Sequence, residues 1–307
     1  MRVPGLLWLS VPLLALAELG AHFFFAQRAP REAEWRALGP AVLAKKRPGE
    51  PIVVAPAWAE PLARHVLGDA AFPLDELARP DAAGLGRVLE IAALGARAEE
   101  MRDFRVVSEE QRGPFVLRVL ENPAPRRARH RFLAHVVPAE LEVSVVDGDQ
   151  AAPCPYDDHA RVVAGGLHGE VTFPRERFVC PGGEASFVGI TVIDDQEYRP
   201  RRCLWAHPPE QGFLRLRFRD VPLGRSLVGF AGLSYFLFRD GLGRPIELRA
   251  RANGALLGSY RHQDEWGWHG FTLPSGEHAG RTVTLDFEVQ SERAPARHFC
   301  FYAESVE

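Results

Sequence analysis

Alternation of apolar and polar residues in the second half of the chain is the feature that most limits the possible fold. It runs through three segments, residues 139–148, 212–221 and 281–289. A period of two residues is typical of strands that bury one face and expose the other. Antiparallel sheets packed face to face accommodate such strands. We therefore expect residues 132–307 to form an antiparallel β-sandwich, jelly-roll-like in topology.

A hairpin is predicted inside this region. Two alternating runs flank Asn253 and Gly254 in the stretch IELRARANGALLGSY. This dipeptide is favoured in two-residue type I′ turns because both of its residues must adopt positive φ.

The preceding part of the chain has a different pattern, in which helical and apolar strand-like segments alternate. A helix is expected over residues 31–44, either broken at Pro40 or closed by the turn RPGE, and another near residues 59–69. Short apolar strands are expected at PIVVAPAW and GRVLEIAALG, then a short helix at ARAEEMRDF and two strands that turn at Arg112-Gly113. Such alternation indicates a small α/β module with a partly parallel sheet.

The predicted fold class is thus α+β, with four parts. Residues 1–30 form a membrane anchor or signal segment, residues 31–122 the α/β module, residues 123–131 a proline- and arginine-rich linker, and residues 132–307 the sandwich.

The amino-terminal segment allows three interpretations. Its apolar run extends from about Leu6 to Ala26, interrupted by Glu18 and His22. This is long enough for a membrane helix and also contains the shorter apolar core of a signal peptide. Ala15-Leu16-Ala17 resembles a cleavage site, whereas the three phenylalanines after His22 extend the run and favour a retained anchor. A helix buried in the protein is the third possibility.

Cysteines and charge restrict the environment and the partners. Four cysteines lie in the second half, and we expect Cys154 to pair with Cys180 and Cys203 with Cys300; four buried free thiols are the alternative. The 307-residue chain has a net charge of -3, and only two of its 37 basic residues are lysines. No basic stripe is interleaved with aromatic residues, so nucleic-acid binding is not expected.

The stretch HQDEWGWHGF is the densest candidate binding site. His262, Asp264 and His269 can exchange hydrogen bonds with sugar hydroxyls, and Trp266 or Trp268 can present a flat face to a sugar ring. The same two histidines and aspartate could also bind a metal. Alternatively, the tryptophans plug the open end of the sandwich. We predict ligand binding by all five residues and no metal site.

Catalytic signatures are weak. Asp194 and Asp195 could act as paired carboxylates, but three nearby arginines, Arg199, Arg201 and Arg202, favour an ion-pair network. No nucleophile motif or phosphate-binding glycine loop occurs in a fitting context. We expect no catalytic residue and no cofactor, although an enzyme is not excluded.

Two segments resemble known families. RPGEPIVVAPAWAEPLARHVLG and RVLEIAALG resemble the small extracytoplasmic α/β tail of multispanning glycosyltransferases that use lipid-linked sugars. The chain lacks that family's acidic first loop and its many membrane segments, so the transferase activity is not implied. The stretch from GRPIELRARANG through VTLDFEV to HFCFYAES resembles the galactose-binding-like jelly roll, which implies a fold that often binds carbohydrate.

These observations lead to one main hypothesis and two alternatives. The main hypothesis is a membrane-anchored binding or accessory protein on the extracytoplasmic face of a bacterial inner membrane, or in the periplasm. It recognises glycan or an envelope protein and is not catalytic. The alternatives are an envelope polysaccharide hydrolase or transferase that uses paired carboxylates, and a structural subunit of a membrane complex.

Overall fold

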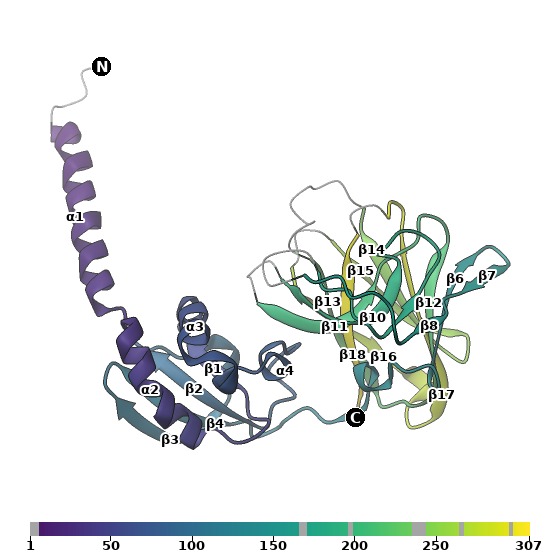
Figure 1. Cartoon of the computed structure of the whole chain (residues 1–307), viewed down its shortest axis with the longest axis horizontal. Coiled ribbons are helices and arrows are strands. Elements are labelled where there is room, and N and C mark those ends of the chain that lie inside the picture. Colours follow the sequence, from purple (N-terminus) through teal and green to yellow (C-terminus); the bar gives the residue numbers. More distant parts are fainter. Residues whose placement is uncertain (1–5, 166–170, 196–198, 235–243, 264–266, 295–296) are drawn as a thin grey trace. The chain divides into compact units, whose positions relative to one another are not determined.

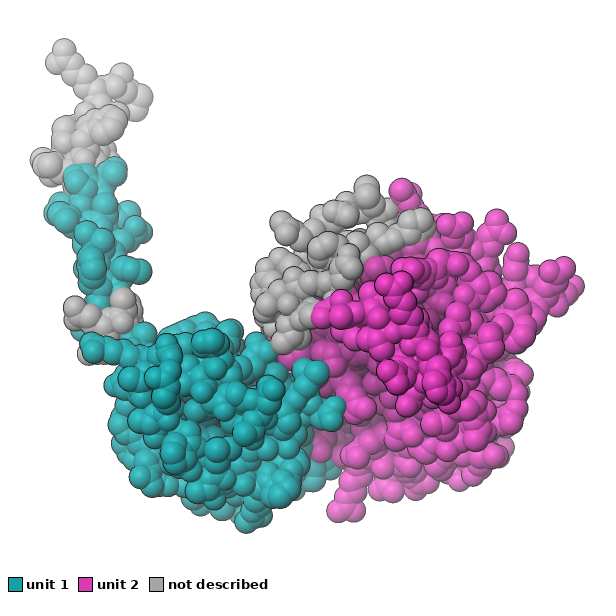
Figure 2. Space-filling view, in the orientation of Figure 1, with its two compact units in different colours: residues 1–77, 85–125 teal, residues 78–84, 126–307 magenta. Residues whose placement is uncertain are grey.

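The computed structural model describes residues 6–165, 171–195, 199–234, 244–263, 267–294 and 297–307 (Figure 1). The chain divides into two compact units, coloured separately in Figure 2. Unit 1 comprises residues 1–77 and 85–125, and unit 2 comprises residues 78–84 and 126–307. The short segment 78–84 therefore belongs to the β-rich unit, although the sequence suggested that it was part of the α/β module.

Unit 1 has the expected partly parallel sheet. Its strands are β1 (Ile52–Ala55), β2 (Arg87–Ala93), β3 (Arg105–Arg112) and β4 (Phe115–Glu121), in the order β1-β2-β4-β3. Strand β1 runs parallel to β2, and the other pairs are antiparallel. The helices are α1 (Leu6–Arg28), α2 (Glu32–Lys45), α3 (Glu60–Ala71) and α4 (Leu74–Leu77), with short 3₁₀ turns η1 (Ala57–Ala59) and η2 (Glu99–Met101). Helix α3 connects the two parallel strands, as such pairs require.

Helix α2 supplies one side of the core of unit 1. Its buried face consists of Trp35, Leu38 and Val42, spaced three and four residues apart. The Trp35 ring lies 4.3 Å from that of Phe115 on β4, measured between centroids. The helix continues through Pro40 and ends at Lys45, so the turn RPGE closes it and the proline does not break it.

Helix α1 is exposed where its side chains are described. Seven large apolar side chains on it are between 50% and 65% exposed: Val11, Leu13, Leu14, Leu16, Leu19, Phe23 and Phe24. The interpretation of this segment as a buried helix is therefore wrong. Within the part of the chain that the structure describes, no helix combines the length and apolar composition needed to cross a membrane. The anchor and the cleaved signal both stay predictions.

Unit 2 is an antiparallel sandwich. The first sheet has the order β16-β13-β18-β11-β10-β9-β8, with β5 also paired to β18, and the second has the order β15-β14-β17-β12-β6-β7. The first-sheet strands are β5 (Ala128–Arg131), β8 (Tyr156–Asp157), β9 (Arg177–Val179), β10 (Phe187–Asp194), β11 (Pro200–Ala206), β13 (Ser226–Leu233), β16 (His269–Pro274) and β18 (Phe299–Val306). Those of the second are β6 (Leu141–Asp147), β7 (Gln150–Pro153), β12 (Phe213–Pro222), β14 (Ile246–Ala252), β15 (Ala255–His262) and β17 (Thr282–Ser291). The short 3₁₀ turns η3 (Phe132–His135) and η5 (Gly276–His278) also belong to this unit.

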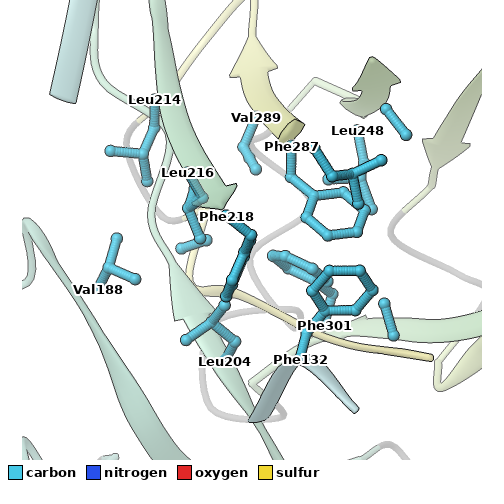
Figure 3. Packing of buried hydrophobic residues seen from close by; sticks show 14 of the residues in the cluster. Phe132, Val188, Leu204, Leu214, Leu216, Phe218, Leu248, Phe287, Val289 and Phe301 are labelled. Carbon is cyan, nitrogen blue, oxygen red and sulfur yellow. The ribbon is translucent and has the colours of Figure 1, made fainter. Parts of the chain in front are cut away.

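The apolar positions of the alternating strands form the core between the two sheets. Leu214, Leu216 and Phe218 of β12 are no more than 1% exposed, as are Phe287 and Val289 of β17 (Figure 3). Phe132 from η3 fills the space between them, with its ring 4.9 Å from those of both Phe218 and Phe287. The period-two pattern therefore predicted the buried face of these strands correctly.

Both predicted disulfides are present. Cys154 pairs with Cys180 and Cys203 with Cys300, so the alternative of free thiols is wrong. The predicted hairpin is also present between β14 and β15, where Asn253 has a φ of 48° and Gly254 a φ of 85°. Two disulfides in one chain indicate an oxidising, extracytoplasmic compartment.

Candidate functional site

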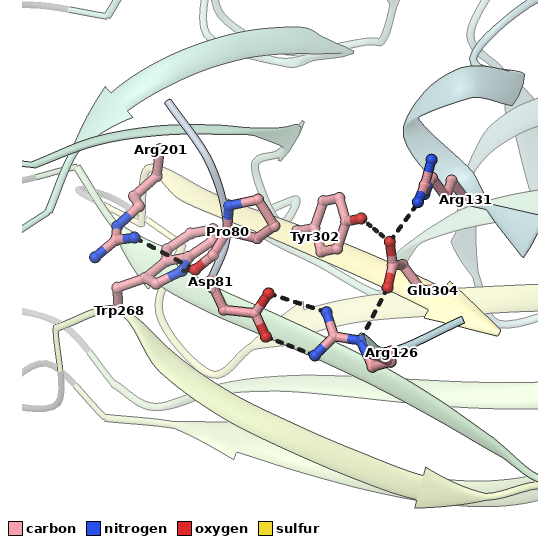
Figure 4. Close-up of polar contacts among 8 residues, drawn as sticks. All are labelled: Pro80, Asp81, Arg126, Arg131, Arg201, Trp268, Tyr302 and Glu304. Carbon is pink, nitrogen blue, oxygen red and sulfur yellow. Dashed lines mark hydrogen bonds and ion pairs between the residues drawn. The ribbon is translucent and has the colours of Figure 1, made fainter. Parts of the chain in front are cut away.

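Trp268 lies on the outer face of the first sheet, immediately before β16, and is half-buried. Its ring packs directly over Gly232 at the end of β13: a Cβ atom at that position would lie 3.0 Å from the indole Cε3. The indole Nε1–H donates a hydrogen bond of 2.9 Å to the carbonyl of Pro80 (Figure 4). The Arg201 guanidinium lies 5.8 Å from the ring centroid, within the range of a cation–π contact.

Phe230 extends this aromatic surface and was not singled out from the sequence. Its ring is within 10° of parallel to that of Trp268, with centroids 6.3 Å apart, and it is also half-buried. It packs over Gly270, where an added Cβ would approach a ring carbon to 3.1 Å. The two glycines thus allow both rings to lie close to the backbone of neighbouring strands. An aromatic side chain at an outward position of an alternating strand was the available sequence signal.

The two histidines of the stretch lie in different environments. His262 is 1% exposed, and its Nδ1 lies 2.9 Å from the hydroxyl of Tyr260. Its side chain therefore lies inside the sandwich, and its contact with a ligand stays a prediction. His269 is exposed, with its ring nearly parallel to that of Tyr260. Asp264 and Trp266 lie outside the described residues.

Segment 78–84 occupies part of the outer face beside Trp268. Its backbone carbonyls accept hydrogen bonds from the first sheet. The Ala78 carbonyl accepts one from the Arg202 backbone N–H, and the Arg79 and Pro80 carbonyls accept one each from the Arg201 side chain. The Asp81 carboxylate pairs with both terminal nitrogens of Arg126, at 2.5 and 3.1 Å. This segment folds against the sandwich because arginines and the indole satisfy its polar groups.

Glu304 accepts hydrogen bonds from several neighbouring side chains (Figure 4). Its side chain is 4% exposed and accepts hydrogen bonds from Arg126 at 3.1 Å and from Arg131 at 3.2 Å. The Tyr302 hydroxyl also donates to it, and burial together with this carboxylate raises the pKa of Tyr302. Such a fully paired network is typical of structural stabilisation.

Asp194 and Asp195 are both buried, at 7% and 4% exposure. Asp194 ends β10 and Asp195 follows it. Asp195 is 4% exposed and accepts a 2.8 Å hydrogen bond from Arg201 and one of 3.0 Å from the Arg199 N–H. Asp195 therefore forms an ion pair, as the nearby arginines led us to expect.

Among the described residues, no group of three or more histidine, cysteine, aspartate or glutamate side chains is arranged to hold a metal ion. This result does not test a metal site made of His262, Asp264 and His269, because Asp264 lies outside the described residues.

Comparison with known proteins does not assign a family. No family model matches the chain, and no curated protein matches it. Among solved structures, one match contains the CBM51-2 and INT domains of Clostridium perfringens ZmpB, at 6% identity and a TM-score of 0.30, covering 69% of this chain and 46% of that one. The chain thus spans less than half of that structure. The resemblance to the glycosyltransferase tail has no support from these matches.

Two further matches are carbohydrate-binding modules. One is TmCBM61 in complex with β-1,4-galactotriose, at 13% identity and a TM-score of 0.23, covering 38% of this chain and 79% of that one. The other belongs to carbohydrate-binding modules of the β-sandwich superfamily, at 8% identity and a TM-score of 0.27, covering 63% and 66%. Similarities of this size establish neither a shared family nor a ligand for this chain, so its function is argued from its own residues.

Proposed function

We propose that this chain is an extracytoplasmic, non-catalytic protein that binds carbohydrate through the outer face of its first sheet. The observation that carries the proposal is the pair of nearly parallel, half-buried rings of Trp268 and Phe230. The apolar C–H face of a sugar ring packs well on such a surface, and directional polar groups beside it supply specificity. Asp264 and Trp266, which lie in the same stretch of sequence, are the proposed polar and aromatic contacts. His269 pairs with Ala231 and stacks on Tyr260, so it lies on the opposite side of β16 from Trp268 and is not part of this surface.

The test is a glycan array probed with the full-length protein and with Phe230→Ala and Trp268→Ala. Saturable binding that falls at least tenfold in both variants, while near-ultraviolet circular dichroism stays native, would support the proposal. Trp58→Ala is the matched control, because Trp58 is 60% exposed and lies in unit 1. Absence of saturable binding by the folded wild-type protein would refute a carbohydrate-binding function.

Helix α1 bears on whether the protein is attached to a membrane. We propose that α1 either holds the protein at a membrane or is removed as a signal peptide, because its described apolar side chains are exposed. Amino-terminal sequencing of protein from the producing cell, with carbonate extraction of membranes, distinguishes the two: an intact terminus in the membrane pellet indicates an anchor, and a terminus near residue 18 indicates cleavage. An intact terminus in the soluble fraction would refute both.

A further inference from the structure

A shallow pocket of about 420 Å³ opens on unit 2, away from the contacts of Trp268. Strand β9 pairs with β10 only at Phe187 and Val188. The next part of β10, residues 190–192, lines the pocket instead. Val136 and Pro174 add apolar surface, and Arg175, Glu176 and Arg202 add charge. Pockets of this size accommodate small ligands of the dimensions of one or two sugar rings.

Two arginines line the pocket, and their charge pairing within the described residues differs from that of neighbouring arginines. Arg177 donates to the carbonyls of Arg161 and Pro174, and Arg201 pairs with Asp195. The guanidinium groups of Arg175 and Arg202, by contrast, make no hydrogen bond or ion pair within the part of the chain that is described. Arg202 is also half-buried, so packing against the described residues restricts its position.

The remaining polar groups of the pocket are already engaged. The Thr191 hydroxyl donates to the Thr172 carbonyl at 2.7 Å. Burial, followed by the nearby Glu176 carboxylate, raises the pKa of Tyr156. The two arginines and Glu176 leave one net positive charge on the pocket. Guanidinium groups bind carboxylates and phosphates through paired donors, and an apolar wall beside them suits the carbon skeleton of the ligand.

We infer that this pocket binds an acidic saccharide, with Arg202 and Arg175 holding its carboxylate or phosphate and the wall at Val136 and Pro174 contacting the sugar ring. The inference deepens the proposed carbohydrate binding, on which it rests, by naming a class of ligand and a second contact surface.

The test measures binding of D-glucuronate, glucose 6-phosphate, D-glucose and inorganic phosphate to the full-length protein by titration calorimetry or ligand-observed NMR. Both anionic sugars should bind at least tenfold more tightly than glucose, and added salt should weaken them because it screens the ion pairs. Arg202→Gln should remove this preference, and Arg202→Lys should retain part of it. Arg215→Gln is the matched control: Arg215 is half-buried and makes no hydrogen bond or ion pair in the described chain, but it lies on β12, in the other sheet.

Three outcomes would overturn the inference. The first is equal affinity for glucuronate and glucose, and the second is equal loss in Arg202→Gln and Arg215→Gln. The third is binding of inorganic phosphate as tight as that of glucose 6-phosphate, which would mean that the pocket does not recognise the sugar. Binding of neutral glycans that depends on Trp268 but not on Arg202 would leave the proposed function standing without this pocket. No saccharide binding of either kind would refute both.

Discussion

At the scale of single residues, buried histidines make the stability of unit 2 depend on pH. His130 is 7% exposed, and burial, followed by the nearby His135, lowers its pKa to about 4. Burial, followed by His207, lowers the pKa of His298 to about 4 as well. In the unfolded chain both would titrate near 6.5, so the folded state favours their neutral form.

Protonation of these histidines favours the unfolded chain, so low pH destabilises the folded protein. Because the folded pKa values are depressed, this contribution is fully present above about pH 6.5 and is lost as pH falls towards 4. We expect the free energy of unfolding, measured by urea titration, to decrease over that interval. The decrease should be smaller in His130→Leu, which cannot titrate. An equal decrease in wild type and variant would show that His130 is not a source of the effect.

Two substitutions at Trp268 separate the contribution of its hydrogen bond to stability from that of its packing. Trp268→Phe removes the hydrogen bond to Pro80 but keeps a ring, and Arg201 still donates to that carbonyl at 3.3 Å. The free energy of unfolding should fall by about 1 kcal/mol. Trp268→Ala should cost about 3 kcal/mol because a large packed side chain is lost. Chemical denaturation measures both, and equal costs would mean that the ring packs little.

At the scale of elements, the hairpin between β14 and β15 depends on one glycine. Gly254 has a φ of 85°, and nothing lies within 4 Å of where a Cβ would be. Gly254→Ala should therefore destabilise the protein through backbone strain alone, by about 1 kcal/mol. Gly84→Ala is the control, because that position also has open space but its φ is not positive; it should be neutral or slightly stabilising. Similar effects of the two substitutions in thermal unfolding would argue against backbone strain.

Segment 78–84 depends on Arg126, which joins Asp81 to Glu304. Arg126→Leu should cost about 3 kcal/mol, because it leaves a buried carboxylate with fewer partners. Amide hydrogen exchange should accelerate in residues 78–84, which report the release of the segment. The control is Arg102→Ala, which removes the exposed pair with Glu99 and should change stability by less than about 1 kcal/mol. Unchanged exchange in Arg126→Leu would show that other contacts hold the segment.

At the scale of the whole molecule, the two disulfides should contribute unequally. Cys154 and Cys180 are separated by 26 residues, and Cys203 and Cys300 by 97. Restricting the unfolded chain stabilises the fold more for the longer loop, by about 4–5 kcal/mol against about 3–4 kcal/mol. The double variant Cys203→Ala/Cys300→Ala should therefore lose more stability than Cys154→Ala/Cys180→Ala. The opposite order in urea titrations would contradict this expectation.

Local patterns made much of this fold predictable. Alternation identified the buried faces of β6, β12 and β17, because successive side chains of a strand point to opposite faces of its sheet and these strands are covered on one face. Asn253-Gly254 located a hairpin because few dipeptides adopt the required positive φ values. Likewise, helix α2 and strands β1, β2 and β4 follow from local apolar patterns. These features depend on neighbours within a few residues, which the sequence shows directly.

The candidate site was predictable only in part. Trp268 was singled out because aromatic and polar residues cluster around it in the sequence, yet its hydrogen bond to Pro80 spans 188 residues. His262 was expected in a loop and its side chain is buried, because Tyr260 and His262 occupy the inward-facing positions at the end of β15. Phe230 could have been noticed only as an aromatic residue at an outward strand position, and the sequence grouped Arg202 with Asp194 and Asp195 and not with Arg175.

The sequence by itself determined the period of each strand, the hairpin turn, the order of the helices and strands of unit 1 and the presence of four cysteines able to pair. Only the tertiary structure decided that segment 78–84 folds with unit 2, that Phe230 lies parallel to Trp268, and that Arg175 and Arg202 line one pocket. The physical reason is distance along the chain. Secondary structure follows from backbone preferences and nearby residues, whereas pockets and platforms arise where strands far apart in sequence become neighbours in a sheet.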